Sequence, residues 1–257
     1  MRITVCEMPD DPAAFERDWK RLGAHAARQD SDLVLLPEMP FYNWVCSAPK
    51  FDHAKWDDAA KAHRVWKRRL PELGAPAVLG SAPVERGGRR VNEGFVWTKK
   101  EGVRGVHLKN YLPLEPGFYE AAWYSRGGKP FVPFDVEGWK AGMMLCTDMW
   151  SMSNARKYGK EGVGLLAVPR ATPERSIAKW IAGGKVAAVV AGAYCASSNR
   201  GGFQGDLRFA GRGWVFSPDG EELALTSKSK PFVTVTIDRV KANHAKTTYP
   251  RYSLEPD

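Results

Sequence analysis

Three side chains that could carry out nucleophilic catalysis together occur at similar places in this sequence. Cys146 follows the apolar run "KAGMML", Glu38 follows "DLVLLP", and Lys109 follows "VRGVHL". A thiol that attacks an amide or nitrile carbon needs a base to take its proton and a positive charge to stabilise the anion that forms. Glu38 can supply the base and Lys109 the ammonium group, and the backbone N–H of Thr147 is a natural second donor. Together these residues predict a cysteine nucleophile.

The alternative interpretation of the same residues is structural. Free cysteines are among the residue types most often buried, and a buried glutamate and lysine neutralise each other when they pair. Taken alone, Cys146 favours this interpretation. The combination favours catalysis, because all three residues follow predicted buried strands, and ligands of α/β sheets bind outside the carboxyl ends of the strands.

Strand-like apolar runs alternate with helical patterns in the first part of the chain. A helix is predicted with Asp11 as its N-cap and Pro12 as its first residue. Its apolar side chains recur at helical spacing and must pack on something: Phe15, Trp19, Leu22 and Ala26. The run "DLVLLPE" is typical of a strand covered on both faces. A second helix is predicted near residues 53–70, with His63 on its apolar side as a packed residue rather than a ligand.

The rest of the chain is richer in strands. "PAVLGSAPVE", "RVNEGFVWTKK" and "VRGVHLK" predict successive strands with antiparallel or mixed pairing, and a hairpin ends at Cys146. A later helix is predicted with Thr172 as its cap and Pro173 at its first position, continuing to about Gly192. This order favours one α/β domain, residues 1–257, with helices outside and strands inside. The polar tail, about residues 244–257, is expected to form an arm over the surface or over a second subunit.

Composition and charge argue against several other classes of protein. The net charge is +9, but the basic residues are dispersed and no nucleic-acid-binding motif accompanies them, so no nucleic-acid partner is expected. The cysteines and histidines show no metal-ligand spacing, so neither a metal nor another cofactor is expected. The longest apolar stretch, residues 186–196, is too short to cross a bilayer, and the N-terminal residues do not read as a signal peptide. The sequence predicts a cytoplasmic protein that binds no membrane.

The motifs around the three chemical residues resemble those of the nitrilase superfamily of carbon–nitrogen hydrolases. "LLPEMPFYNW", "HLKNYLP" followed by "PGFYE", and "GMMLCTDMW" are similar to the three catalytic motifs of the family and occur in its order. "LLAVPRAT", "SSNRGG" and "GWVFSPDGE" resemble later strands and turns, so the similarity covers nearly the whole chain. The resemblance implies a four-layer α-β-β-α sandwich, a Glu38–Lys109–Cys146 triad, and a homodimer or higher homo-oligomer.

The resemblance also implies a second glutamate, in the loop after the lysine, which helps to position the substrate and to orient the lysine. The run "PGFYEAAWYSRGG" makes Glu120 the better match, and Glu115 remains an alternative. The sequence departs from the family after the cysteine, where "CTDMWSMSNAR" has Ser and Met in place of the Pro-Glu of many members.

Substrate contacts are suggested by the same resemblance. Related amidases use arginine or aromatic residues near this segment, which makes Tyr42, Trp150 and Arg170 candidates here. Arg170 could bind a substrate carboxylate through two parallel hydrogen bonds. Its alternative role is a structural salt bridge to Asp148 or Glu174.

The expected function is hydrolysis of a non-peptide carbon–nitrogen bond in a small amide or N-carbamoyl substrate. The reaction would pass through a cysteine thioester and release ammonia, with a small-molecule amide as the only partner besides a second copy of the chain. Two alternatives remain open: a nitrilase that uses the same residues on a small nitrile, and a non-catalytic binding protein on the same fold.

Overall fold

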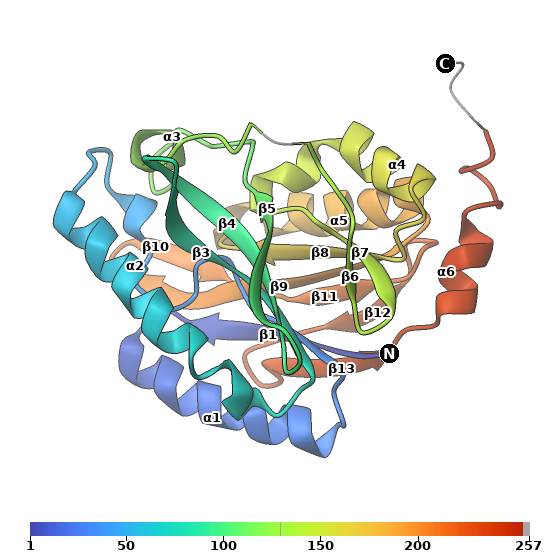
Figure 1. The fold of residues 1–257 in the computed structure, drawn as a ribbon, viewed down its shortest axis with the longest axis horizontal. Coiled ribbons are helices and arrows are strands. Elements are labelled where there is room, and N and C mark those ends of the chain that lie inside the picture. The colour runs from blue at the N-terminus through green and yellow to red at the C-terminus, as the bar shows by residue number, and fades with distance from the viewer. Residues whose placement is uncertain (129, 254–257) are drawn as a thin grey trace.

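A computed structural model describes residues 1–128 and 130–253, and Figure 1 shows strands packed between two groups of helices. One sheet has the order β13-β1-β2-β3-β4-β5, with parallel pairing from β1 to β3 and antiparallel pairing at both edges. Its strands are β13 (Phe232–Thr236), β1 (Arg2–Pro9), β2 (Leu33–Leu35), β3 (Ala77–Arg86), β4 (Arg89–Thr98) and β5 (Gly102–Leu108). Antiparallel or mixed pairing was predicted for the last three, and their pairing with one another is antiparallel.

The second sheet has the order β6-β7-β8-β9-β11-β12, with β7, β8 and β9 parallel. A further strand, β10, pairs with the outer half of β9. The bounds are β6 (Phe134–Val136), β7 (Trp139–Met143), β8 (Leu165–Arg170), β9 (Tyr194–Gln204), β10 (Leu207–Ala210), β11 (Trp214–Phe216) and β12 (Glu222–Leu225).

Strand β1 belongs to both sheets. Its first residues pair with β13 and β2, and its last residues, Glu7–Pro9, pair with residues 199–201 of β9. The two sheets are therefore joined at one side and face each other elsewhere. Apolar side chains of both sheets fill the space between them, among them Leu35, Leu79, Met143 and Ala167.

Helices cover the outer faces of the two sheets. Helices α1 (Pro12–Arg28) and α2 (His53–Lys67) pack on the first sheet, and α4 (Met152–Lys160) and α5 (Ile177–Ala191) pack on the second. Figure 1 shows the two pairs on opposite sides of the strands. The short helices are α3 (Glu120–Trp123) and α6 (Arg239–Ala245). The predicted four-layer α-β-β-α sandwich is thus confirmed.

Local sequence explains why α1 begins where it does. The Asp11 side chain accepts a hydrogen bond from the Ala14 N–H, and Pro12 occupies a position where a missing N–H costs nothing. The predicted apolar stripe of α1 is buried against the sheet. His63 of α2 is also buried, with its Nε2 accepting from the Phe41 N–H, so it is a packed residue as expected.

The start of α5 differs from the prediction. Helix α5 begins at Ile177, after a separate turn of 3₁₀ helix at Glu174–Ser176, instead of at Pro173. Thr172 does not cap the helix because its hydroxyl accepts hydrogen bonds from Arg170 and Asn199. The predicted end is correct, since Gly192 closes the helix with φ of +58°.

The polar tail packs on the molecule as far as the structure describes it. Arg251 is buried, donates to the carbonyl of Ala245 and pairs with Asp219 at 2.9 Å. Residues 254–257 of the expected arm lie outside the described residues. Within the described part of the chain, no helix has the length and apolarity needed to span a bilayer.

Candidate active site

A buried lysine joins two buried carboxylates where the two sheets meet the loops. Lys109 directly follows β5, and its Nζ lies 2.7 Å from Glu38 Oε1 and 2.6 Å from Glu120 Oε2. All three side chains are inaccessible to solvent. Ionisable groups are buried at such cost that they persist only when paired, and here each carboxylate has the lysine as its partner. The structure therefore brings the predicted Glu38, Lys109 and Glu120 together.

Hydrogen bonds hold both the backbone and the side chain of Glu38. Its N–H donates to the carbonyl of Arg170 on β8 at 3.1 Å, and its own carbonyl accepts from Arg200 Nε. On the side chain, Asn92 Nδ2 of β4 donates to Oε1 at 2.8 Å. The segment after β2 is thus tied to both sheets, which fixes the direction of the Glu38 carboxylate.

Cys146 lies at the turn between β7 and a short 3₁₀ helix, Cys146–Trp150. Its φ is +48°, in the left-handed region that residues other than glycine rarely adopt. Its Sγ lies 4.0 Å from the carbonyl oxygen of Ala171, and the side chain lines the same pocket as Glu120. The positive φ is a strain of the kind that persists where surrounding structure holds a functional residue in place.

Asp148 connects the loop of Lys109 with the turn of Cys146. Its carboxylate accepts from the backbone N–H groups of Asn110 and Tyr111 on one side and from that of Leu145 on the other. The ring of His107 supplies a further contact at 2.8 Å. One buried side chain therefore sets the position of the residues beside both Lys109 and Cys146.

Burial and mutual attraction control the ionisation of the lysine and the second glutamate. Burial opposes the charged form of Lys109, but Glu120 and Glu38 outweigh it and raise the pKa of Lys109 well above its usual value. Burial raises the pKa of Glu120 to about 7, with Lys109 acting in the opposite direction. Lys109 therefore keeps its charge, and Glu120 exchanges a proton near neutral pH.

The thiol of Cys146 is held in its neutral form. Burial raises the pKa of Cys146 well above its usual value, Glu38 adds to the rise, and Lys109 opposes it. A base must therefore take the proton as the sulfur attacks. Glu38 Oε2 and Glu120 Oε1 are buried oxygens without a hydrogen-bond partner among the described residues. Each carboxylate thus uses one oxygen to hold Lys109 and leaves the other open to a proton.

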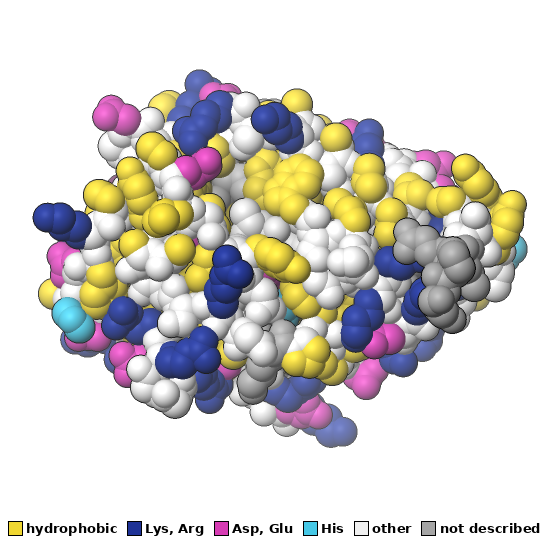
Figure 2. Space-filling view, turned by 90° about the horizontal axis from the view of Figure 1, so that it is seen from above, with side chains coloured by type: hydrophobic (Ala, Val, Ile, Leu, Met, Phe, Trp, Pro, Cys, Tyr) yellow, Lys and Arg dark blue, Asp and Glu magenta, His cyan; other side chains and the backbone are white. Residues whose placement is uncertain are grey.

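A pocket of about 310 Å³ opens over Cys146 and is walled mainly by apolar side chains. Figure 2, which views the molecule from the side of α3, α4 and α5, shows apolar side chains gathered around a hollow. The residues that line the pocket are Pro113, Glu115, Phe118, Glu120, Cys146, Thr147, Trp150, Ala171, Thr172, Pro173, Ser176, Lys179 and Trp180.

The predicted site residues divide between this pocket and its surroundings. Thr147 lines the pocket, and the hydrogen bonds of the described residues include none from its backbone N–H. Trp150 lines it as well. Glu115 lies at the rim with its side chain 60% exposed, in contrast to the buried Glu120 beside Lys109. Of the two candidates, only Glu120 is in contact with the lysine.

Two of the proposed substrate contacts do not reach the pocket. Tyr42 packs on the edge of an apolar cluster around Trp44 and is absent from the pocket lining. Arg170 is fully buried behind the wall, and its N–H groups donate to Ser197, Thr172 and the carbonyl of Arg212. Neither residue is among those that line the cavity in the described part of the chain.

The salt bridges expected for Arg170 are not formed either. In the described part of the chain, Glu174 pairs with Arg208 and Asp148 contacts His107. The Arg170 guanidinium instead lies 3.7 Å above the ring of Trp214. Burial lowers the pKa of Arg170 to about 9.

Sequence reasoning missed several residues that support the site. Asn92, in the middle of β4, holds Glu38, and Tyr124 donates to Glu120 Oε2. The sequence suggests Asp148 only as a salt-bridge partner of Arg170. A polar residue in an otherwise apolar strand, such as Asn92 in "VNEGFVW", is the signal that could have found the first of these.

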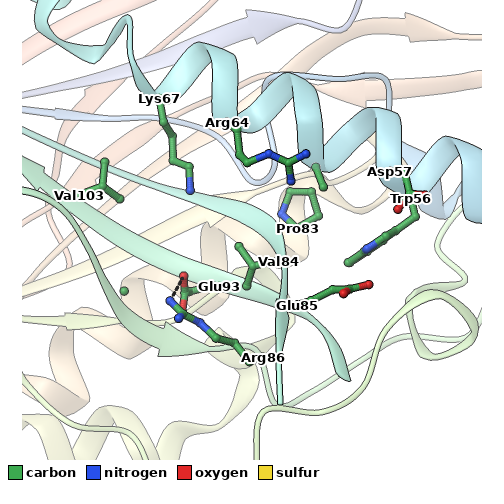
Figure 3. A pocket seen from close by; sticks show the side chains of 12 residues that line it. Trp56, Asp57, Arg64, Lys67, Pro83, Val84, Glu85, Arg86, Glu93 and Val103 are labelled. Atoms are coloured by element: carbon green, nitrogen blue, oxygen red, sulfur yellow. Dashed lines mark hydrogen bonds and ion pairs between the residues drawn. The ribbon is translucent and has the colours of Figure 1, made fainter. Parts of the chain in front are cut away.

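A larger pocket of about 580 Å³ lies between α2 and strands β3 to β5. Figure 3 shows Arg64 and Lys67 pointing from α2 toward the strands, where Arg86 and Glu93 form an ion pair of 2.7 Å. None of the residues that line it is a cysteine, serine or threonine, so it presents no side chain suited to nucleophilic attack on an amide carbon. The smaller pocket over Cys146 is therefore the candidate active site. Among the described residues, no cluster of His, Cys, Asp and Glu could hold a metal ion.

The chain is similar to several known proteins. The sequence profile of the family described as Carbon-nitrogen hydrolase matches residues 2–247. The chain is 25% identical over 246 residues to the hydrolase in the pqqF 5' region of Pseudomonas protegens, covering 93% of this chain and 83% of that protein. A carbon–nitrogen hydrolase from Helicobacter pylori has the same fold, with a TM-score of 0.87 and 22% identity over 98% of this chain and 94% of that one.

A second similar structure is a variant of an amidase from Nesterenkonia sp. AN1, with a TM-score of 0.74 and 22% identity over 95% of this chain and 92% of that one. That protein carries a covalently added acetamide moiety at its active-site cysteine. Fold and site together define an amidase-type enzyme of the nitrilase superfamily. The chain belongs to the carbon–nitrogen hydrolase family.

Proposed function

We propose that the protein hydrolyses the carbon–nitrogen bond of a small amide or N-carbamoyl compound, with Cys146 as the nucleophile. The observation that carries the proposal is the buried contact of Lys109 with Glu38 and Glu120 next to a cysteine that opens into a pocket. The covalent adduct on the cysteine of the related amidase supports the same role for the sulfur here.

In the proposed first half of the reaction, the open Oε2 of Glu38 takes the proton of Cys146 while the sulfur attacks the carbonyl carbon. The oxygen becomes negatively charged and is stabilised by Lys109 Nζ and the backbone N–H of Thr147. The carbon–nitrogen bond then breaks, and ammonia leaves with the proton returned by Glu38. The acyl group remains on Cys146 as a thioester.

In the second half, Glu38 takes a proton from a water molecule that attacks the thioester carbon. The same two donors stabilise the second oxyanion. Collapse of that intermediate releases the carboxylic acid and returns the proton to the sulfur. Glu120 keeps Lys109 in position throughout, because its Oε2 holds the ammonium at 2.6 Å.

The test is a screen of amides, N-carbamoyl compounds and nitriles for ammonia release, with mass spectrometry of the protein. We expect a substrate that gives ammonia and an acyl adduct on Cys146, and no turnover by Cys146→Ala with an unchanged circular dichroism spectrum. Cys195→Ala, which removes a buried thiol outside the pocket, is the matched control and should retain turnover. Activity of the Cys146→Ala variant would refute the proposal, and reaction with nitriles alone would favour a nitrilase.

The proposal extends to the form in which the enzyme works. We infer one catalytic domain over residues 1–257, since Lys109 follows a strand of the first sheet and Cys146 follows one of the second. A cytoplasmic homodimer or higher homo-oligomer remains the expectation from the family resemblance. The four cysteines are all free, which fits a reducing compartment. Sedimentation measurements test the oligomeric state.

A further inference from the structure

The walls of the pocket over Cys146 carry little charge that a substrate could use. Apart from Glu120, which is engaged by Lys109, the charged residues of the lining are Glu115 and Lys179. Both are exposed at the rim, and Glu115 already lies 3.7 Å from Arg175. Exposed charges are screened by water and contribute little to binding. An anionic group carried into the pocket would lose its water without gaining a buried partner. A cationic group would meet only one buried carboxylate, that of Glu120, whose Oε2 already pairs with Lys109.

A second buried cation near the pocket, Arg170, does not change this conclusion. Arg170 lies behind the wall with its N–H groups used by Ser197, Thr172 and a backbone carbonyl, and it is not part of the lining. The pocket volume of about 310 Å³ lies at the lower end of the range for ligand pockets. Size and wall chemistry therefore both point to a small and uncharged acyl group.

One wall of the pocket is an aromatic pair. The rings of Trp150 and Trp180 lie 5.1 Å apart at an angle of 52°, and Trp150 remains 45% exposed. Tilted aromatic pairs at this distance attract each other, and their faces offer a flat apolar surface. An acyl chain or ring of the substrate can pack there.

A glycine on α5 makes room for that wall. A Cβ atom at Gly183 would lie 2.7 and 2.9 Å from ring atoms of Trp150 and 3.0 Å from the methyl of Met149. Contacts this close force a neighbour to move, so only glycine lets the Trp150 ring rest against the helix. The position of the ring, and with it the width of the pocket, therefore depends on the missing side chain of Gly183.

From these contacts, and resting on the proposed function, we propose that the enzyme is selective for amides with an uncharged, largely apolar acyl group. We assign to Gly183 the role of a specificity-determining residue that acts through Trp150. It does not touch the substrate. Because Gly183 has no side chain, the Trp150 ring can pack directly on α5. Gly183 thereby determines how large an acyl group can enter the pocket.

Three amides of matched length test the substrate class: hexanamide, the monoamide of adipic acid and ω-aminohexanamide. We expect kcat/KM for hexanamide to exceed that for each charged analogue by roughly tenfold or more, the scale that pocket contacts reach in enzymes. A charged analogue that is turned over faster overturns the inference.

The same order is expected in binding to the Cys146→Ala variant, followed by the fluorescence of the pocket tryptophans. This second readout needs no turnover. If the charged analogues bind more tightly there, the inference about the substrate class fails. If the order of binding is as expected but no amide is hydrolysed, the proposed function fails while the inference about the pocket stands.

Gly183→Ala tests the role of the glycine. We expect it to lower the ratio of kcat/KM for hexanamide to that for acetamide by roughly tenfold, because the displaced ring narrows or disorders the wall. In the Trp150→Ala background the same change should leave the ratio unaltered, since there is no ring to displace. Ala182→Ser, on the neighbouring exposed position of α5, is the control. An equal effect of Gly183→Ala in both backgrounds contradicts the assigned role.

Discussion

Cys146 adopts a backbone conformation that suits glycine better than cysteine, with φ of +48°. A side chain in the left-handed region costs on the order of 1 kcal/mol, and this cost remains when only the sulfur is removed. The neighbouring residues therefore hold Cys146 in a backbone conformation that cysteine disfavours. A nucleophile at the end of a strand needs such a fixed position.

This strain predicts an unusual order of stability. Cys146→Gly should be more stable than Cys146→Ala by about 1 kcal/mol, because glycine takes the positive φ without a clash. The order is expected to reverse at Cys195, in β9, where φ is not positive. Urea unfolding of the four variants measures both differences, and the same order at the two positions would show that the turn is not strained.

Glu120 makes the free energy of unfolding depend on pH. Burial raises its pKa to about 7 in the folded protein, above the value of an exposed glutamate near 4.5. Its contribution to stability is therefore fully present below about pH 4.5 and is lost as the pH rises through about 7.

The free energy of unfolding of the wild type, relative to Glu120→Gln, should accordingly fall by about 3 kcal/mol over that range. Glu115→Gln, which changes an exposed carboxylate of the same loop, is the matched control and should leave the pH dependence as it is. Thermal or urea unfolding at several pH values measures the difference. A flat difference between wild type and Glu120→Gln would mean that folding does not change the pKa of Glu120.

At the scale of elements, the site depends on where β5 ends. Gly127 lies against that end: its N–H donates to the carbonyl of Lys109, and a Cβ there would lie 2.4 Å from the Cβ of Leu108 and 2.7 Å from its carbonyl oxygen. Backbone atoms cannot give way as a flexible side chain can. Only glycine at position 127 allows the loop to cross the strand so closely.

Gly127→Ala should therefore displace Lys109. We expect a loss of stability of about 1–3 kcal/mol, as for other overpacked sites, together with a large fall in kcat. Gly102→Ala, at the opposite end of β5, is the control: it has φ of +73° but open space around it, so it should cost stability and leave turnover intact. Full activity of the Gly127→Ala variant would show that the strand end does not position the lysine.

The ends of strands were predictable from sequence, and the packing between them was not. Glu38 and Cys146 each follow a short apolar run that forms a buried strand, as predicted. The burial predicted for the strand before Lys109 is wrong, because β5 lies at the edge of its sheet and is exposed over most of its length. The start of α5 was missed because Thr172 and Pro173 form a good cap sequence locally. Tertiary hydrogen bonds from Arg170 and Asn199 use the Thr172 hydroxyl instead.

The orientation of buried polar side chains could not be predicted from the sequence either. Arg170 follows the same pattern as Glu38, at the end of a buried strand, yet it lies behind the pocket wall on Trp214. Whether such a side chain faces a cavity depends on the partners that other strands supply. Those partners, such as Ser197 and Asn92, are ordinary strand residues with no motif of their own.

For the whole molecule, the site can exist only when both sheets are formed. The carboxylates and the lysine come from segments beside the first sheet, whereas Cys146 comes from the second, and β1 belongs to both. We expect amide turnover, tryptophan fluorescence and far-ultraviolet circular dichroism to be lost with one midpoint in urea. Cys195→Ala should move all three midpoints together. Separate midpoints would show that the two sheets unfold independently.

The pairing of β1 has a consequence for how the protein is made. Thr4 bonds to Thr234 across 230 positions of the chain, and the end of β1 pairs with residues 199–201. A ribosome releases β1 and its early partner β2 long before it has synthesised β9 or β13, and contacts of such separation form slowly. The pairings of the nascent N-terminal strand with β9 and β13 must therefore wait until almost the entire polypeptide has emerged.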